Sequence, residues 1–156
     1  MPFNNNSSKT SYKQTCYDSY RIIDANLNRS KEGLRVCEDI LRFHYNNKTL
    51  SKNFSNLRHT ITGLIKKSKV DKKMLFKHRN SKDDIGQRFF LGPKRSTYKD
   101  IFFANSQRVK EGFRALEEFS KLFDTRLSKN IQKLRFEYYE LEKKTVKKFP
   151  SLLDPR

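Results

Sequence analysis

A thirteen-residue motif, Asn-x-x-Arg-x-x-Glu-Gly-x-Arg-x-x-Glu, occurs twice in the chain. The first copy begins at Asn26 and the second at Asn105, 79 residues later. A Leu-Arg pair also recurs, at Leu57-Arg58 and Leu134-Arg135, with a spacing of 77 residues. Internal similarity over this distance predicts two related structural units that bury their apolar faces against one another.

Apolar residues recur every three or four positions in four segments, as they do in amphipathic helices. The predicted helices span 17–45, a segment from a Thr49 cap to about 65, a segment from a Ser96 or Thr97 cap to about 123, and a segment from Asp124 or Thr125 to about 148. A short helix is expected around 74–77. Because the chain has only five glycines and four prolines, little interrupts these helices. The sequence predicts an all-α fold.

Each half of the duplication predicts one helical hairpin. Two such hairpins can pack about a pseudo-twofold axis to give a four-helix core, joined by a long crossover loop. We expect one helical domain over 13–149, with repeat 1 at about 17–68, the crossover at 69–97 and repeat 2 at about 98–148. Residues 1–12 are expected to be disordered, and 150–156 to form a loosely held tail.

Length and charge restrict the class of protein. The 156 residues suit one domain, and the N-terminus lacks the apolar segment of a signal peptide. No stretch approaches the roughly 18 apolar residues of a membrane span. Cys16 and Cys37 match neither a disulfide framework nor a zinc motif. We therefore expect a cytoplasmic protein without a membrane partner. The net charge of +18 favours phosphate-bearing ligands, although much of it reflects scattered lysines.

The duplicated motif places polar groups beside the apolar helix faces. At about 100° per residue, Asn26 and Gly33 lie within the apolar stripe and Arg29 flanks it; the second copy repeats this with Asn105, Gly112 and Arg108. Buried polar groups need hydrogen-bond partners.

Two interpretations of these polar residues remain open. Glutamates of the motif could pair with arginines and fix the helix register, namely Glu32, Glu38, Glu111 and Glu117. Alternatively, a guanidinium cluster could hold phosphate near the axis, formed by Arg29, Arg58, Arg108 and Arg135.

Other side chains have less specific patterns. Arg35 and Arg114 fall on the opposite side of their helices and are expected at the surface. The loop at 79–97 contains Asp83 and Asp84 just before Gly86, which could hold Mg²⁺ or a proton, or could simply form a turn. Its later part brings Lys94 and Arg95 to a helix N-terminus, where anions bind well, although both could be solvated.

These residues together resemble a known family. The segments that carry the resemblance are IIDANLNRSKEGLRVCEDILRF, LRH, Arg79 with Asp84-Ile85-Gly86, ANSQRVKEGFRALEEFSKL and LRFEYYELE. In this order they are similar to the helical domain found alone or fused ahead of thiamine-phosphate synthase, described as a noncanonical hydroxymethylpyrimidine phosphate kinase. The resemblance covers about residues 20–143. The synthase itself is a barrel of alternating strands and helices, which this pattern excludes.

The resemblance implies ATP-dependent phosphorylation of 4-amino-5-hydroxymethyl-2-methylpyrimidine phosphate to its pyrophosphate, with Mg²⁺ as a second cofactor. No Walker A loop or protein-kinase signature is present, so the chemistry must be argued from charge. We expect phosphate and substrate to be bound by Asn26, Arg29, Arg58, Arg79, Gly86, Asn105, Arg108 and Arg135. The expected catalytic residues are Asp84 and Asp24, and the expected metal ligands are Glu32 and Glu111. Asp24 has no counterpart in the second copy, where Phe103 stands.

Two other functions compete with the kinase. One is a catalytically silent partner domain of thiamine-phosphate synthase. The other is a basic nucleic-acid-binding helical module, which the +18 charge favours. We do not expect nucleic acid as the main partner, because the duplicated arginines lie beside apolar faces rather than along a solvent-facing stripe. A homodimer is compatible with the sequence.

Overall fold

The computed structural model describes residues 5–88 and 92–153, and every regular element within them is helical. In chain order these elements are α1 (Asn5–Asp39), the π-helical turn η1 (Ile40–His44), α2 (Lys48–Lys67), α3 (Lys72–His78), the 3₁₀ turn η2 (Ile85–Arg88), α4 (Tyr98–Ser120), α5 (Thr125–Lys148) and the 3₁₀ turn η3 (Pro150–Leu152). The prediction of an all-α fold is confirmed.

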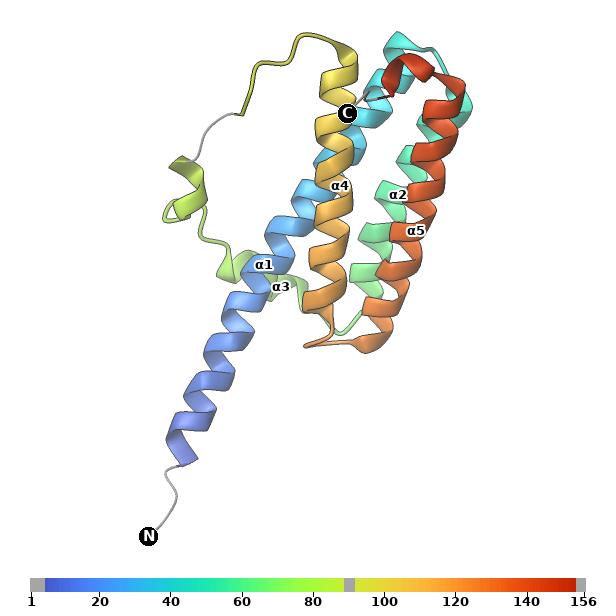
Figure 1. Ribbon diagram of the computed structural model, residues 1–156. Helices are drawn as coiled ribbons and strands as arrows, with labels where there is room; N and C mark the ends of the chain where they lie inside the picture. Colours follow the sequence, from blue (N-terminus) through green and yellow to red (C-terminus); the bar gives the residue numbers. More distant parts are fainter. Residues whose placement is uncertain (1–4, 89–91, 154–156) are drawn as a thin grey trace.

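Four long helices form the body of the molecule (Figure 1). Helices α1 and α4 run in opposite directions against one another along most of α4, and α2 and α5 pack beside them. The short helix α3 packs against α1, so the segment after it starts next to the first copy of the motif. The N-terminal part of α1 extends beyond the other three long helices (Figure 1). None of the helices in the described residues is long and apolar enough to cross a membrane.

Aromatic rings fill the centre of the core. Phe54 of α2 packs edge-on against Phe102 of α4 and Tyr138 of α5, at centroid distances of 6.1 and 5.9 Å. Tyr138 also meets Phe113 edge-on at 6.2 Å. All four side chains are fully buried. Edge-to-face pairs of this kind contribute about 0.5–1.5 kcal/mol beyond the burial of their area, so they tie α2, α4 and α5 together.

The motif glycines set the distance between α1 and α4. A Cβ atom added to Gly33 would lie 2.8 Å from the backbone oxygen of Asn105 and 2.9 Å from Val109 Cγ2. A Cβ atom on Gly112 would clash with Ser30 Oγ and lie 3.1 Å from the backbone oxygen of Asn26. Each glycine therefore meets the backbone at the motif asparagine of the other copy. These close approaches explain glycine in a helix interior, where it otherwise costs about 1 kcal/mol relative to alanine.

The N-terminal boundary differs from the prediction. Helix α1 begins at Asn5, so residues 5–12, which were expected to be disordered, are helical; residues 1–4 of that segment lie outside the described residues. Side chains along the projecting part hydrogen-bond within the helix, for example Thr15 Oγ1 to the Ser11 carbonyl at 3.0 Å and Gln14 Nε2 to Asp18 Oδ1 at 3.0 Å. Because no glycine or proline interrupts 5–32, α1 continues without support from the other long helices.

Other boundaries follow from capping. Helix α2 is capped by Asn47 and not by Thr49, because the Asn47 side chain accepts a hydrogen bond from the backbone N–H of Leu50. Thr97 caps α4 in a reciprocal pair with Asp100, and Asp124 caps α5, as predicted.

The C-terminal tail is more ordered than expected, since Leu152 is fully buried; residues 154–156 lie outside the described residues. In the crossover, η2 forms at 85–88, and residues 89–91 also lie outside them.

Candidate functional site

A cleft of about 440 Å³ lies between α1 and the segment that follows α3. It brings together five residues that the sequence predicted for the site, from positions up to 60 residues apart: Asp24, Asn26 and Arg29 on α1, and Arg79 and Asp84 after α3. The remaining lining residues are Asp18, Arg21, Ile22, Ala25, Asn28, Asn80 and Ser81. The cleft is mixed in charge, with three arginines and three aspartates.

An ion pair between Asp24 and Arg79 joins the two segments that line this cleft. Arg79 Nε and one terminal nitrogen donate to the two carboxylate oxygens of Asp24, each at 2.6 Å. The Asp24 side chain is 8% exposed and that of Arg79 is 40% exposed. The hydrogen bonds to Asp24 raise the pKa of Arg79. The guanidinium also lies 4.8 Å from the Phe76 ring centroid. Because both oxygens of Asp24 accept from Arg79, this carboxylate positions the arginine and is poorly placed to act as a base.

Asp84 is the more accessible carboxylate of the two expected catalytic residues. It is exposed, and its Oδ1 accepts a hydrogen bond from the backbone N–H of Gly86 at 2.9 Å. Nearby, Asn80 and Asp83 hold the turn by two mutual hydrogen bonds. Gly86 thus orients Asp84 through its backbone and does not itself line the cleft. A carboxylate fixed at the edge of a cleft, without an ion-pair partner among the described residues, suits Mg²⁺ binding or proton transfer.

The arginines of the cleft differ in how they are held. Arg29 is exposed and Arg21 is half-buried, and neither forms an ion pair within the described residues. Asn26 donates a hydrogen bond from Nδ2 to the Ile22 carbonyl at 2.9 Å, one turn earlier in α1. The cleft therefore contains two guanidinium groups, Arg21 and Arg29, that are free to meet an anion, and a third, Arg79, already fixed by Asp24.

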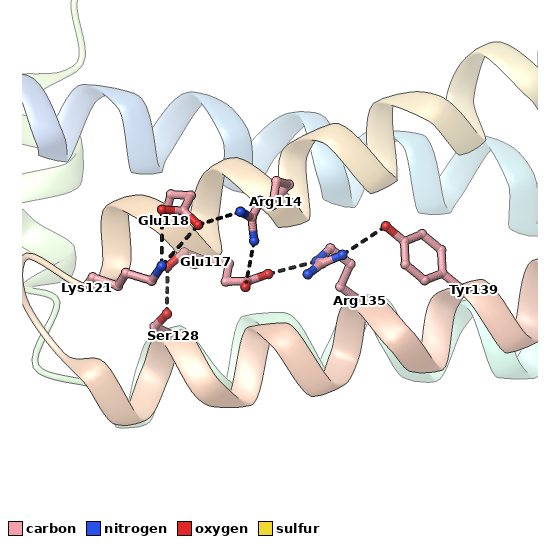
Figure 2. Close-up of polar contacts among 7 residues, drawn as sticks. All are labelled: Arg114, Glu117, Glu118, Lys121, Ser128, Arg135 and Tyr139. Carbon is pink, nitrogen blue, oxygen red and sulfur yellow. Dashed lines mark hydrogen bonds and ion pairs between the residues drawn. The ribbon is translucent and has the colours of Figure 1, made fainter.

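The second copy of the motif forms a buried ion-pair cluster (Figure 2). Glu117, at 3% exposure, accepts from Arg135 Nε on α5 at 2.8 Å and from Arg114 on its own helix at 2.9 Å. Arg135 also donates to the Tyr139 hydroxyl at 3.0 Å, and the hydrogen bond to Glu117 raises the pKa of Arg135. The Ser128 hydroxyl donates to the backbone oxygen of Glu117 at 2.7 Å. These contacts join α4 to α5.

The first copy repeats this arrangement with longer distances. Glu38, at 6% exposure, accepts from Arg58 Nε at 3.3 Å and from a terminal nitrogen of Arg58 at 3.1 Å. Arg35 lies 3.6 Å from the other oxygen of Glu38. The last glutamate of each motif therefore binds the arginine of the recurrent Leu-Arg pair in the same half. For Glu38 and Glu117, the structure favours the first of our two interpretations, in which the ion pairs fix the register of the helices.

The remaining predicted site residues lie outside the cleft. Arg58 and Arg135 are held by their glutamates, between different pairs of helices, and do not form one cluster with Arg29 and Arg108 in the described interactions. Arg108 and Glu32 are exposed. Asn105 donates to the Ile101 carbonyl at 2.8 Å, as Asn26 does to Ile22. Glu111 lines a different, open cleft of about 660 Å³ beside Arg114 and Tyr139.

Several lining residues of the cleft were not predicted from the sequence. Arg21 and Asn28 lie on the face of α1 that carries Asp24, at spacings of three and four residues, so a helical projection centred on Asp24 could have found them. Asp18 lies six residues before Asp24 and so about 120° around the helix, where such a projection does not reach. Asn80 and Ser81 depend on the path of the chain after α3, which no local pattern indicates. Among the described residues, no group of three or more His, Cys, Asp or Glu side chains is arranged as a metal site. A single carboxylate such as Asp84 with phosphate oxygens is a more usual environment for Mg²⁺.

The chain is similar to proteins of one known family. The chain matches the ThiD2 family over residues 21–144. It is 35% identical over 125 residues to a thiamine-phosphate synthase of Nostoc punctiforme and 36% identical over 125 residues to one of Prochlorococcus marinus strain AS9601. A thiamine-phosphate synthase of Thermosynechococcus vestitus is 36% identical over 124 residues. No solved structure matches the chain.

The matched region defines a helical domain that these longer proteins share. It covers 78–79% of this chain and 34% of each of these three relatives, so the chain spans about a third of their length. The chain belongs to the ThiD2 family, and the resemblance expected from the sequence is confirmed. The match begins at Arg21 and includes every residue of the cleft except Asp18.

Proposed function

We propose that this protein acts in thiamine biosynthesis as a phosphotransferase. It would transfer the γ-phosphoryl group of ATP to 4-amino-5-hydroxymethyl-2-methylpyrimidine phosphate, giving the pyrophosphate and ADP. The observation that carries the proposal is the meeting of Asp24, Asn26, Arg29, Arg79 and Asp84 in one cleft. These residues come from two segments that the sequence analysis had selected separately. The names of the relatives support thiamine biosynthesis as the pathway.

The side chains of the cleft suit phosphoryl transfer to a phosphate. Crowded phosphate oxygens require several positive charges held in fixed positions. Arg29 and Arg21 supply charges without ion-pair partners among the described residues, and Arg79 supplies one whose orientation is set by Asp24. Asp84 would hold Mg²⁺ or orient the attacking oxygen. Asn26 has its Nδ2 hydrogen-bonded to the helix, so its carbonyl oxygen is the atom that would accept from the pyrimidine amino group.

A direct assay tests the proposed reaction. The purified protein would be incubated with ATP, Mg²⁺ and the hydroxymethylpyrimidine phosphate, and the products followed by ³¹P NMR. We expect the signals of a pyrophosphate ester and ADP to appear together, and to require both Mg²⁺ and the pyrimidine. If ATP remains intact under these conditions, or is hydrolysed at the same rate without the pyrimidine, the proposed activity is wrong.

A partner domain of thiamine-phosphate synthase is the second candidate function. It is favoured by the coverage of the relatives, which contain the shared domain within chains about three times as long as the matched region. A domain of this kind would bind the synthase without moving phosphate. Titration of the purified synthase with this protein, followed by analytical ultracentrifugation, separates the two functions. A complex together with no turnover in the ³¹P assay would favour the partner domain over the kinase.

A further inference from the structure

A second cleft, of about 730 Å³, lies at the end of the molecule where α2 ends and α5 begins. Four of its lining side chains are cations from two segments distant in sequence: Lys67 and Lys69 at the end of α2 and just after it, and Lys121 and Arg126 just after α4 and at the start of α5. The other lining residues are Leu64, Ser68, Phe123, Asp124, Thr125, Leu127 and Asn130. This basic cleft shares no residue with the candidate site.

The one acidic residue of the basic cleft is engaged by the backbone. Asp124 Oδ1 accepts from the N–H groups of Arg126 and Leu127, at 3.0 and 3.2 Å, and Oδ2 accepts from the N–H of Lys69 at 3.2 Å. Asp124 therefore fixes the two cationic segments relative to one another. Its carboxylate forms no ion pair with the lining lysines within the described residues. The positively charged side chains of the cleft can therefore bind an external anion.

Most cations of the basic cleft have no ion-pair partner within the described residues. Lys67, Lys69 and Arg126 are exposed and form no ion pair within the described residues. Lys121 binds Glu118 at 3.1 Å, but Glu118 is shared with Arg114 at 2.9 Å. Four more exposed lysines flank the cleft in sequence, namely Lys66, Lys72, Lys73 and Lys129. Asp71, which lies among them, caps α3 by accepting from the N–H of Lys73 at 2.9 Å. The positive charge at this end is thus concentrated and largely uncompensated.

We propose that the basic cleft binds a chain of linked phosphates, either inorganic polyphosphate or the backbone of a single-stranded nucleic acid. The four cations of the cleft match repeated phosphate charges, whereas a single small anion would occupy only some of them. The aromatic ring in the cleft is not available to stack on a base, because Phe123 is half-buried and packs on Tyr20 at 4.8 Å between centroids. The cleft therefore contacts phosphates without reading base sequence.

Fluorescence anisotropy with a short labelled oligothymidylate tests this binding. The key variant removes the four cations of the cleft by Lys67→Gln, Lys69→Gln, Lys121→Gln and Arg126→Gln. The matched control removes four exposed lysines at the other end of α2 and α5, by Lys48→Gln, Lys52→Gln, Lys143→Gln and Lys147→Gln. A third variant, Arg29→Ala, separates this binding from the candidate site. Circular dichroism before each titration confirms that the variants are folded.

The cleft variant is expected to bind at least ten times more weakly than the unaltered protein. Its plot of log K against log salt concentration should be shallower by about 3, since each lost single-strand contact removes about 0.7 from the slope. The control and Arg29→Ala should each stay within about threefold. Equal losses in the cleft variant and the control would show that diffuse charge, not the cleft, binds the probe. If neither the oligonucleotide nor inorganic triphosphate binds the unaltered protein, the proposal is also overturned.

Competition with inorganic triphosphate distinguishes the two sources of linked phosphates. Displacement of the oligonucleotide by triphosphate from the unaltered protein identifies short polyphosphates as sufficient ligands. Failure of triphosphate to displace it identifies the longer nucleic-acid backbone as the ligand. If triphosphate binds the cleft variant as tightly as the unaltered protein, the four cations do not form its site, and the proposal is wrong for polyphosphate.

Discussion

Asp24 on α1 accepts two hydrogen bonds of 2.6 Å from Arg79, 55 residues later in the chain, and so fixes the segment after α3 against the first copy of the motif. Both residues line the candidate cleft. Its counterpart cannot exist in the second copy, where Phe103 replaces Asp24. The duplication therefore repeats the helices but not this cleft, and we place the proposed chemistry in the first copy.

The coupling of Asp24 and Arg79 can be measured directly. We expect Asp24→Asn and Arg79→Gln each to lower the free energy of unfolding by about 1–2 kcal/mol, because each breaks a bidentate, charge-assisted contact. The 40% exposure of Arg79 keeps the effect below that of a buried pair. In a double-mutant cycle by urea unfolding, the interaction energy should be about 1 kcal/mol. Additive effects would mean that the pair does not hold the segment in solution.

Substitution of a glycine by alanine should have opposite effects on stability at the α1–α4 contact and on α2. Gly33→Ala should destabilise the fold by about 1–3 kcal/mol, because its Cβ would press on the Asn105 carbonyl and force the helices apart. Gly63→Ala on α2 is the control, since a Cβ there meets nothing within 4 Å. It should stabilise the protein by about 0.5–1 kcal/mol through helix propensity. Thermal unfolding measures both changes, and stabilisation by both would contradict the close helix contact.

The two buried glutamates predict a graded response. Glu117→Ala leaves Arg135, whose side chain is only 12% exposed, without its main partner and should cost about 3 kcal/mol. Glu38→Ala should cost less, because the hydrogen bonds of Arg58 to Glu38 are longer, at 3.1–3.3 Å against 2.8 Å. Urea unfolding gives both values. The reverse order, or no loss in either variant, would show that these ion pairs do not stabilise the packing of α1 against α2 and of α4 against α5.

Asp124 predicts sensitivity to acid. Partial burial alone would raise the pKa of Asp124, but hydrogen bonds from the N–H groups of Leu127, Lys69 and Arg126 lower it overall. A carboxylate with a lowered folded pKa contributes stability above its unfolded pKa of about 3.9. That contribution is lost as the pH falls from this value through the folded pKa.

Asp124→Asn tests this assignment, because asparagine retains the helix cap but cannot ionise. We expect the stability of the variant at pH 7 to change by less than that of Asp124→Ala, which should lose about 1 kcal/mol. Between pH 7 and 3, Asp124→Asn should lose less stability than the unaltered protein, measured by urea unfolding at each pH. Identical pH profiles for Asp124→Asn and the unaltered protein would contradict the proposed role.

Local sequence patterns predicted most of the helices, because helix formation and capping depend on residues close together in the sequence. The apolar period, the Thr97 cap and the Asp124 cap act within one helix, and α4 and α5 begin where these residues indicate. The predicted start of the first helix was wrong, because polar residues without an apolar period can still continue a helix when no glycine or proline interrupts it. The burial of Leu152 depends on tertiary contact, which no local pattern reports.

The site was less predictable than the fold. The recurrent arginines were predicted to form one group, but their neighbours differ in the structure. Buried glutamates bind Arg58 and Arg135, whereas Arg29 lines the cleft. The sequence signal for these ion pairs was the glutamate that ends each motif, Glu38 or Glu117, whose pairing with an arginine was one of the two open interpretations. The cleft itself depends on the path of the chain after α3, and so on the Asp24–Arg79 contact between distant residues.

Arg29 and Arg108 occupy the same position in the two copies of the motif and are both exposed, but only Arg29 lines the candidate cleft. The most direct test of the proposed site is therefore kcat/KM for the hydroxymethylpyrimidine phosphate in Arg29→Ala and Arg108→Ala. A charge-assisted hydrogen bond to phosphate is worth about 1.5–3 kcal/mol, so Arg29→Ala should lose about 10- to 100-fold, and Arg108→Ala less than about twofold. Equal losses in both variants, or full activity in a folded Arg29→Ala protein, would contradict the placement of the reaction in this cleft.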